Sequence, residues 1–382
     1  MIDEQYSLMR GGMVYRLMRA DRLEGRERPL APWVALALLI IVLVPVGMLA
    51  ARDGTLVAGV EVPLLRDYTV WARFVLCMPL LVLAAPLADE RLWRAQRHLG
   101  KLVEPQDHDR FMRGLQGIRR WRDSAWPELA LFVITVASAF VAPPLDVYAK
   151  VTSWRFVGHD ATAGGLWLNF VGMPLFRFLV LLWLWRQLLW ICLLWQFARV
   201  RLALHAAHPD GCAGLSFLGF AQASFIVLPL MGALLVTGSL AMEVQYLQVS
   251  LHSLRYVLLG YIVLGTAIMV APLLLLSPRL AAIKRASLLA YGALGTDCAE
   301  QFEDKWLGRA RGGAAPILEA GDSSALADLT GVYATVNGMS TVPLQRFVLI
   351  QFVLASSAPL LPVVLLTMPI DELVDKLLSS LI

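Results

Sequence analysis

Long apolar stretches separated by polar connections dominate the chain. A transmembrane helix needs roughly 20 mostly apolar residues, and about seven stretches meet or approach that length. They predict spans at residues 33–51, 69–88, 126–142, 172–198, 217–242, 254–277 and 347–368. We therefore expect an all-α fold, in which a polytopic transmembrane helical bundle forms a single membrane domain over residues 1–382. Apolar residues at helical spacing in the tail, 370–382, predict a C-terminal amphipathic helix.

Two long connections carry many of the basic residues. Residues 89–125 show amphipathic patterns on both sides of Glu104 and Pro105, which predicts two surface helices. Residues 279–346 show two further helical patterns, which we expect to form a small cap. Lys and Arg are enriched in cytosolic loops, so both connections and the N-terminus are predicted to be cytosolic.

The composition agrees with a membrane protein. The chain is 58% hydrophobic with a mean hydropathy of +0.65, too apolar for an ordinary soluble domain. The net charge is only +4, so no nucleic-acid partner is expected. The four cysteines form no C-x-x-C pair and none is placed for an extracytoplasmic disulfide.

The fourth span contains two arginines. Arg186 lies roughly 20 Å from Arg199 at a rise of 1.5 Å per residue, which places it inside the hydrocarbon. An unsatisfied arginine there costs at least a few kcal/mol. Arg177 lies roughly 33 Å from Arg199 and can reach the other interface.

Several partners for Arg186 are open at this stage. Trp183 and Trp190 occupy the same helical face and could stack on the guanidinium. Backbone carbonyls at a helix break, internal water, a displaced Glu128 or Glu243, or a passing anion are the alternatives. The arginine is thus either a helix-packing residue or part of a solvated, anion-attracting pathway.

The fifth span is rich in small and polar residues, among them Ser224 and Thr237. Such a face allows close helix packing or lines a polar path. Pro229 is expected to loosen the middle of this helix and free a carbonyl that faces Arg186.

A turn follows the fourth span. Pro209 ends the helix and biases His208 toward an extended conformation. Asp210 before Gly211 is typical turn chemistry, and Gly214 continues the turn. The turn is either structural or a contact for an ion, an anion or a partner. No metal site is expected, because no standard zinc spacing joins His205, His208, Asp210 and Cys212.

Catalytic motifs are missing. We find no P-loop, no dinucleotide fingerprint and neither H-E-x-x-H nor G-x-S-x-G. We therefore predict no enzymatic activity and no cofactor.

Several short sequences carry a resemblance. They are Leu65-Arg66-Asp67-Tyr68, Arg73-Phe74, Pro174-Leu175-Phe176-Arg177-Phe178, Trp185-Arg186, His208-Pro209-Asp210 with Gly214-Leu215, residues 324–329 and Asp371-Glu372-Leu373. In these pieces the chain resembles a family of uncharacterised bacterial polytopic inner-membrane proteins. The turn departs from the family pattern at Cys212-Ala213, where small residues and a glycine are expected. The resemblance implies a multi-pass fold in the bacterial cytoplasmic membrane and no particular activity.

Two functions follow as hypotheses. The first is a channel or transporter-like homo-oligomer for a small ion, with an anion favoured, through a pathway near Arg186. The second is a non-transporting scaffold or signalling protein, in which residues 89–125 and 279–346 recruit partners or anionic lipid. Contact with membrane lipid is common to both.

Overall fold

The computed structural model describes residues 30–141, 151–157, 160–307 and 322–367. This part is almost entirely helical, with a single small antiparallel pair of strands, β1 (Phe156–Val157) and β2 (Asp160–Ala161). Within it, six helical runs are long and apolar enough to cross a membrane, or up to seven if a bent pair counts as one span. The all-α class is thereby confirmed, and the chain is a multi-pass membrane protein. The expected C-terminal helix lies outside the described residues.

The helices follow one another in a simple order. They are α2 (Leu30–Arg52), α3 (Tyr68–Val70), α4 (Met78–Leu102), α5 (His108–Asp123), α6 (Ala125–Val141), α8 (Ala163–Trp167), α9 (Met173–Phe197), α10 (Phe217–Gln222), α11 (Val227–Leu247), α12 (Leu251–Val270), α13 (Ser277–Trp306), α14 (Asp322–Gly338), α15 (Arg346–Ser357) and α16 (Leu361–Thr367). Short 3-10 or π-type turns join or flank them: η1 (Leu64–Arg66), η2 (Trp71–Cys77), η3 (Pro105–Asp107), η4 (Leu168–Gly172), η5 (Ala223–Phe225), η6 (Ala271–Leu276) and η7 (Ala358–Leu360).

Several helices are longer than the apolar stretches predict. The run Tyr68–Leu102 continues past the expected end of its span, so the first expected surface helix is an extension of the same rod. The run Ala163–Phe197 has 35 residues, which is roughly 52 Å at 1.5 Å per residue. A hydrocarbon core is only about 30 Å thick. Both rods must therefore extend beyond the membrane.

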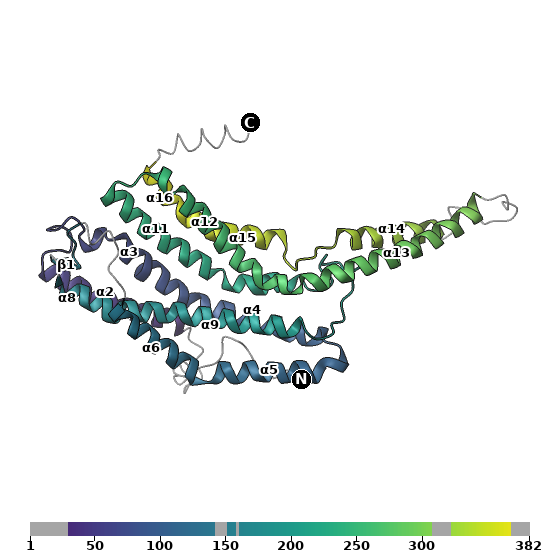
Figure 1. Ribbon diagram of the computed structural model, residues 1–382, viewed down its shortest axis with the longest axis horizontal. Helices are drawn as coiled ribbons and strands as arrows, with labels where there is room; N and C mark the ends of the chain where they lie inside the picture. Colours follow the sequence, from purple (N-terminus) through teal and green to yellow (C-terminus); the bar gives the residue numbers. More distant parts are fainter. Residues whose placement is uncertain (1–29, 142–150, 158–159, 308–321, 368–382) are drawn as a thin grey trace.

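The elongated bundle has two ends that carry different connections (Figure 1). We call the end that carries α5, the loop of residues 198–216 and the α13–α14 hairpin the basic end. The opposite end carries loops that are joined by the fully buried Asp67. Its carboxylate accepts hydrogen bonds from the Trp154 indole at 2.9 Å and from the Arg155 guanidinium at 2.8 Å.

The α13–α14 hairpin projects from the basic end as an extended structure, which we call the arm (Figure 1). We expected these residues to form a small cap, and this expectation was wrong. The reason is helical continuity, because α12, η6 and α13 form one helical run of 54 residues, Ser253–Trp306. A continuous rod carries its end away from the bundle instead of folding beneath it.

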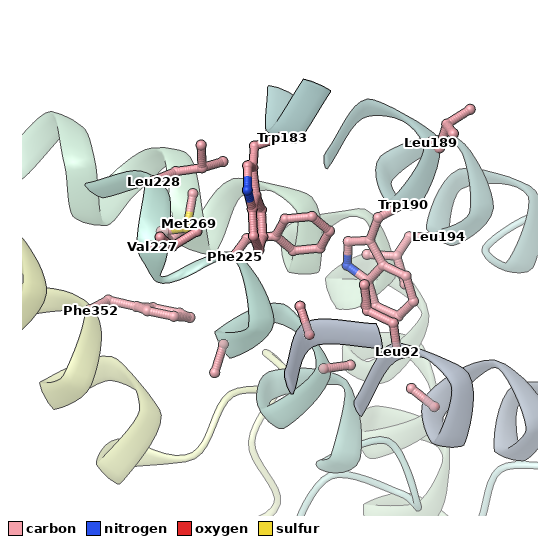
Figure 2. Close-up of a cluster of buried hydrophobic side chains, with 14 of the residues drawn as sticks. Leu92, Trp183, Leu189, Trp190, Leu194, Phe225, Val227, Leu228, Met269 and Phe352 are labelled. Carbon is pink, nitrogen blue, oxygen red and sulfur yellow. The ribbon is translucent and has the colours of Figure 1, made fainter. Parts of the chain in front are cut away.

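Aromatic side chains fill the core around α9. Trp183 and Trp190 are buried, and the ring of Phe225 meets Trp183 edge-on with 6.3 Å between ring centroids (Figure 2). The Trp183 indole N–H donates to the Leu81 carbonyl at 3.0 Å, and the Trp190 indole N–H donates to the Gln222 side-chain oxygen at 2.9 Å. These bonds fix α9 against α4 and α10.

Candidate functional site at the basic end

The depth of Arg186 is set by helix α5. The Trp121 ring lies 6.3 Å from the Trp185 ring, and the Phe111 ring lies 6.2 Å from the Phe197 ring. Helix α5 therefore runs beside α9 over the segment that contains Arg186. Because α5 carries several exposed arginines, it cannot lie in hydrocarbon. Arg186 thus lies beside α5, toward the basic end of the bundle, and not among apolar segments alone as the sequence suggested.

Two acids accompany Arg186. The carboxylates of Glu128 on α6 and Asp89 on α4 interact electrostatically with its guanidinium. Glu128 is buried, whereas Asp89 and Arg186 are partly buried. Glu128 was one of the alternatives open from the sequence, and Asp89 was not among them. A sequence signal for this was available, since both acids flank the same polar connection, Asp89 just after one apolar stretch and Glu128 at the start of the next.

Trp183 and Trp190, which could have stacked on Arg186, have structural roles instead. Their indole N–H groups point to α4 and α10, as described above. Among the described residues, no aromatic ring makes a cation–π contact with Arg186. Trp183 and Trp190 are therefore core residues that anchor α9.

Pro229 lies near the middle of the helical run Phe217–Leu247, in the first turn of α11 and just after η5, the 3-10 turn that interrupts this run. A proline is tolerated there because the missing N–H has no intrahelical acceptor. Its own carbonyl accepts a hydrogen bond from the Tyr261 hydroxyl at 2.6 Å. Helix α9 contacts α10 and η5 through Trp190 and Trp183. The expected pairing of Arg186 with a carbonyl of this segment stays a prediction.

The remaining polar residues of the spans are separate from one another. Arg177 donates to the Ser138 hydroxyl at 2.6 Å, which ties α9 to α6. The Thr237 hydroxyl bonds to the Ala233 carbonyl at 2.8 Å and to the Pro359 carbonyl at 2.5 Å. Ser224 is buried, and its hydroxyl finds no partner within the described part of the chain. These residues do not form one site with Arg186.

Asp210 organises the turn after α9. Its carboxylate accepts hydrogen bonds from the backbone N–H groups of Cys212, Gly214 and Ser216 at 2.9, 3.0 and 3.0 Å. His208 Nδ1 lies 2.9 Å from the Asp210 Oδ1 atom. Partial burial alone would raise the pKa of Asp210, but these hydrogen bonds outweigh it and lower the pKa to about 2.

The turn uses left-handed backbone at three positions. Gly211, Ala213 and Gly214 have φ angles of +66°, +54° and +90°, and Ala213 adopts this conformation without being glycine. Burial and the neighbouring Asp210 carboxylate raise the pKa of the Cys212 thiol to about 11, so the sulfur stays protonated. In the described residues no group of three or more His, Cys, Asp or Glu is arranged to hold a metal ion.

The same turn supports the base of the arm. The Ser340 N–H, just after α14, donates to the Gly211 carbonyl at 2.8 Å. The Arg279 guanidinium, at the start of α13, donates to the Val200 carbonyl. Across the arm, Lys284 Nζ donates to the Met339 carbonyl at 2.9 Å. The start of α13 and the segment just after α14 are thus both hydrogen-bonded to the loop of residues 198–216.

Three buried glutamines were not predicted from the sequence. Gln96, Gln187 and Gln222 come from α4, α9 and α10, and all are buried. Among the described residues, the side-chain amides of Gln96 and Gln187 have no hydrogen-bond partner, and Gln222 leaves its NH₂ group unpaired. Buried amides of this kind are usually satisfied by internal water. Their polarity is visible in the sequence, but their burial depends on how the three helices pack.

Comparison with known proteins adds no further assignment. No protein-family model, curated protein or solved structure matches this chain.

Proposed function

We propose that this protein is a scaffold of the bacterial cytoplasmic membrane, with its N-terminus and its basic end in the cytosol, and that its arm binds a helix of a cytosolic protein. The orientation follows from the concentration of Lys and Arg at the basic end. The binding function rests on one observation, the exposed apolar face of α13.

That face consists of the residues of α13 that point away from α14. At 3.6 residues per turn they recur as Ala282, Ala286, Leu289, Ala290 and Ala293, and all are exposed. Leu289 is 78% exposed, and this part of the arm lies beyond the bundle (Figure 1). Small residues around one large apolar side chain allow a second helix to approach closely.

The outer half of the same face indicates the charge of the partner. Beyond Ala293 it continues with Asp297, Glu300, Glu303 and Asp304, which are all exposed. A helix that lies along the arm would therefore meet an apolar strip followed by acids. An amphipathic helix with a basic end complements both.

The base of the arm suits a rigid presentation of this face. The hydrogen bonds of Arg279 and Ser340 to the loop of residues 198–216 hold both helices at the bundle. A fixed base reduces the conformational entropy that binding would otherwise cost.

Site-specific photo-crosslinking in cells tests this proposal. A crosslinking residue at Ala293 is expected to yield an adduct of one defined mass, which mass spectrometry then identifies. Ala334 on α14 is the matched control, since it is also an exposed alanine of the arm but points away from α13. The exposed-site change Leu289→Asp should abolish the Ala293 adduct. Equal adducts at both positions, or none at Ala293, would contradict partner binding by this face.

Ion passage by a homo-oligomer is the second candidate function. The unpartnered amides of Gln96, Gln187 and Gln222 favour it, because they offer polar groups inside an apolar bundle. Glu128 and Asp89 compensate the charge of Arg186, so its attraction for an anion is weaker than that of an unpaired arginine.

Flux measurements in liposomes separate the two functions. If the glutamine-lined interior conducts, wild-type protein carries anions or cations, and Gln187→Leu and Arg186→Leu reduce the flux while folding is retained. If the wild-type protein carries no flux and the Ala293 adduct still forms in cells, the scaffold function is supported and ion passage is excluded.

A further inference from the structure

Arg177 of α9 carries a charge that no acidic side chain balances within the described part of the chain. Its Nη1 atom donates a hydrogen bond to the Ser138 hydroxyl of α6 at 2.6 Å. Arg186 on the same helix differs, because two carboxylates interact with its guanidinium. We propose that Arg177 binds a small inorganic anion, of the size of chloride, between α6 and α9.

The Arg177 guanidinium lies in the apolar part of the bundle. Along α9, Arg177 lies roughly 14 Å from Arg186 at 1.5 Å per residue, on the side away from the basic end. The same helical run begins at Ala163, roughly 21 Å beyond Arg177. On α6, Ser138 lies roughly 15 Å from Glu128, so both helices give the same depth. An unpaired charge at this depth in hydrocarbon is costly, and a bound anion removes that cost.

Two side chains bring unused hydrogen-bond donors to the same turn of α6. The Asn169 amide donates to the Ala139 carbonyl at 2.9 Å, and Ala139 directly follows Ser138, the partner of Arg177. An arginine has five N–H groups and an asparagine amide has two. Each side chain uses one of them within the described chain, so both retain N–H groups for an anion. The guanidinium bonds to a hydroxyl and to no described carbonyl of α6, so it does not act as a helix cap.

The surroundings of these donors suit a small ion. Asn169 belongs to η4, a π-type turn, and such turns are frequent at functional sites. On one side, the Phe140 and Phe170 rings meet with 5.2 Å between their centroids. On the other side, the Phe132 and Phe178 rings meet at 5.7 Å. The donors therefore lie between two apolar contacts, where a hydrogen bond is electrostatically stronger than in water. Anion binding here does not depend on partner binding by the arm.

Equilibrium binding of radioactive chloride to the purified full-length protein in detergent tests the site. We expect saturable binding by the wild type and none by Arg177→Gln, which removes the charge. Asn169→Leu keeps the charge but removes one donor, and it should weaken chloride binding about ten-fold. Tryptophan fluorescence and the elution volume in size-exclusion chromatography show whether each variant is folded.

A matched variant controls for the loss of charge alone. Arg110→Gln removes the same charge from an exposed position of α5 and should bind chloride as the wild type does. The proposal is overturned if the wild type binds no saturable chloride, if folded Arg177→Gln binds it with wild-type affinity, or if Arg110→Gln loses as much. Should Arg177→Gln not fold, Asn169→Leu decides, and wild-type affinity in that variant overturns the proposal. Displacement of chloride by stoichiometric phosphatidylglycerol would also overturn it, in favour of a lipid headgroup.

Discussion

At the scale of single residues, Asp210 illustrates how a charged side chain replaces regular secondary structure. The turn that it closes contains three left-handed residues and therefore cannot satisfy its own N–H groups through a helix. One carboxylate accepts three of them. Because Gly211 of the same turn accepts a hydrogen bond from Ser340, shortly after α14, the effect of Asp210 reaches the arm.

The substitution Asp210→Asn tests this role. We expect it to lower the free energy of unfolding by about 1–2 kcal/mol at pH 7, because charge-assisted hydrogen bonds weaken. The folded-state pKa of about 2 lies below the ordinary aspartate value, about 3.9. The stabilisation is therefore fully present above about pH 4 and is lost as the pH falls toward 2.

Unfolding of purified protein, followed by tryptophan fluorescence between pH 2 and 7, measures this difference. Asp297→Asn on the exposed surface of α13 is the control and should change little. If the difference in the free energy of unfolding between wild type and Asp210→Asn stays constant down to pH 2, the lowered pKa of Asp210 is disproved.

At the scale of elements, close approach of α11 to the start of the second span holds part of the bundle together. A Cβ atom at Gly238 would lie 2.7 Å from the Ala72 Cβ and 3.0 Å from the Tyr68 carbonyl oxygen. The small residues of the fifth span thus serve packing at this position, as small residues commonly do between membrane helices.

Gly238→Ala is expected to destabilise the protein by about 1–3 kcal/mol, because the added methyl forces apart two backbones. Gly260→Ala in α12 is the matched control, since nothing lies within 4 Å of the added atom. Thermal unfolding in detergent compares the two variants. Equal midpoints for both would show that α11 does not pack as closely as described.

At the scale of the whole molecule, the two ends of the bundle should lie on opposite sides of one membrane. The arm with Cys298 belongs to the basic end, and the exposed Ala58 belongs to the opposite end. Positive residues favour the cytosolic side for the basic end.

Labelling of single cysteines checks this arrangement. In variants without other cysteines, a membrane-impermeant maleimide should modify Ala58→Cys in intact cells and Cys298 only after permeabilisation. Labelling of Cys298 in intact cells would reverse the proposed orientation, and labelling of both would contradict a sealed bundle between them.

The sequence by itself determined the class of this fold. Apolar stretches of span length can be stable only as helices in lipid, so the all-α bundle and the helical character of α13 and α14 followed from local pattern. The sequence also singled out His208, Pro209 and Asp210 as a turn, because proline and Asp-Gly chemistry act within a few residues.

Only the tertiary structure decided where Arg186 lies along the bundle and which helices pack against one another. The position of Arg186 could not be read from its distance to Arg199, because that argument assumes that the helix ends at the membrane surface. Helix α5, with its exposed arginines, packs beside the last part of α9, so this part of α9 lies outside the apolar bundle. The shape of the arm was misjudged for a similar reason. Which face of a helix meets which neighbour, and how far a rod continues, depends on contacts between segments far apart in the chain.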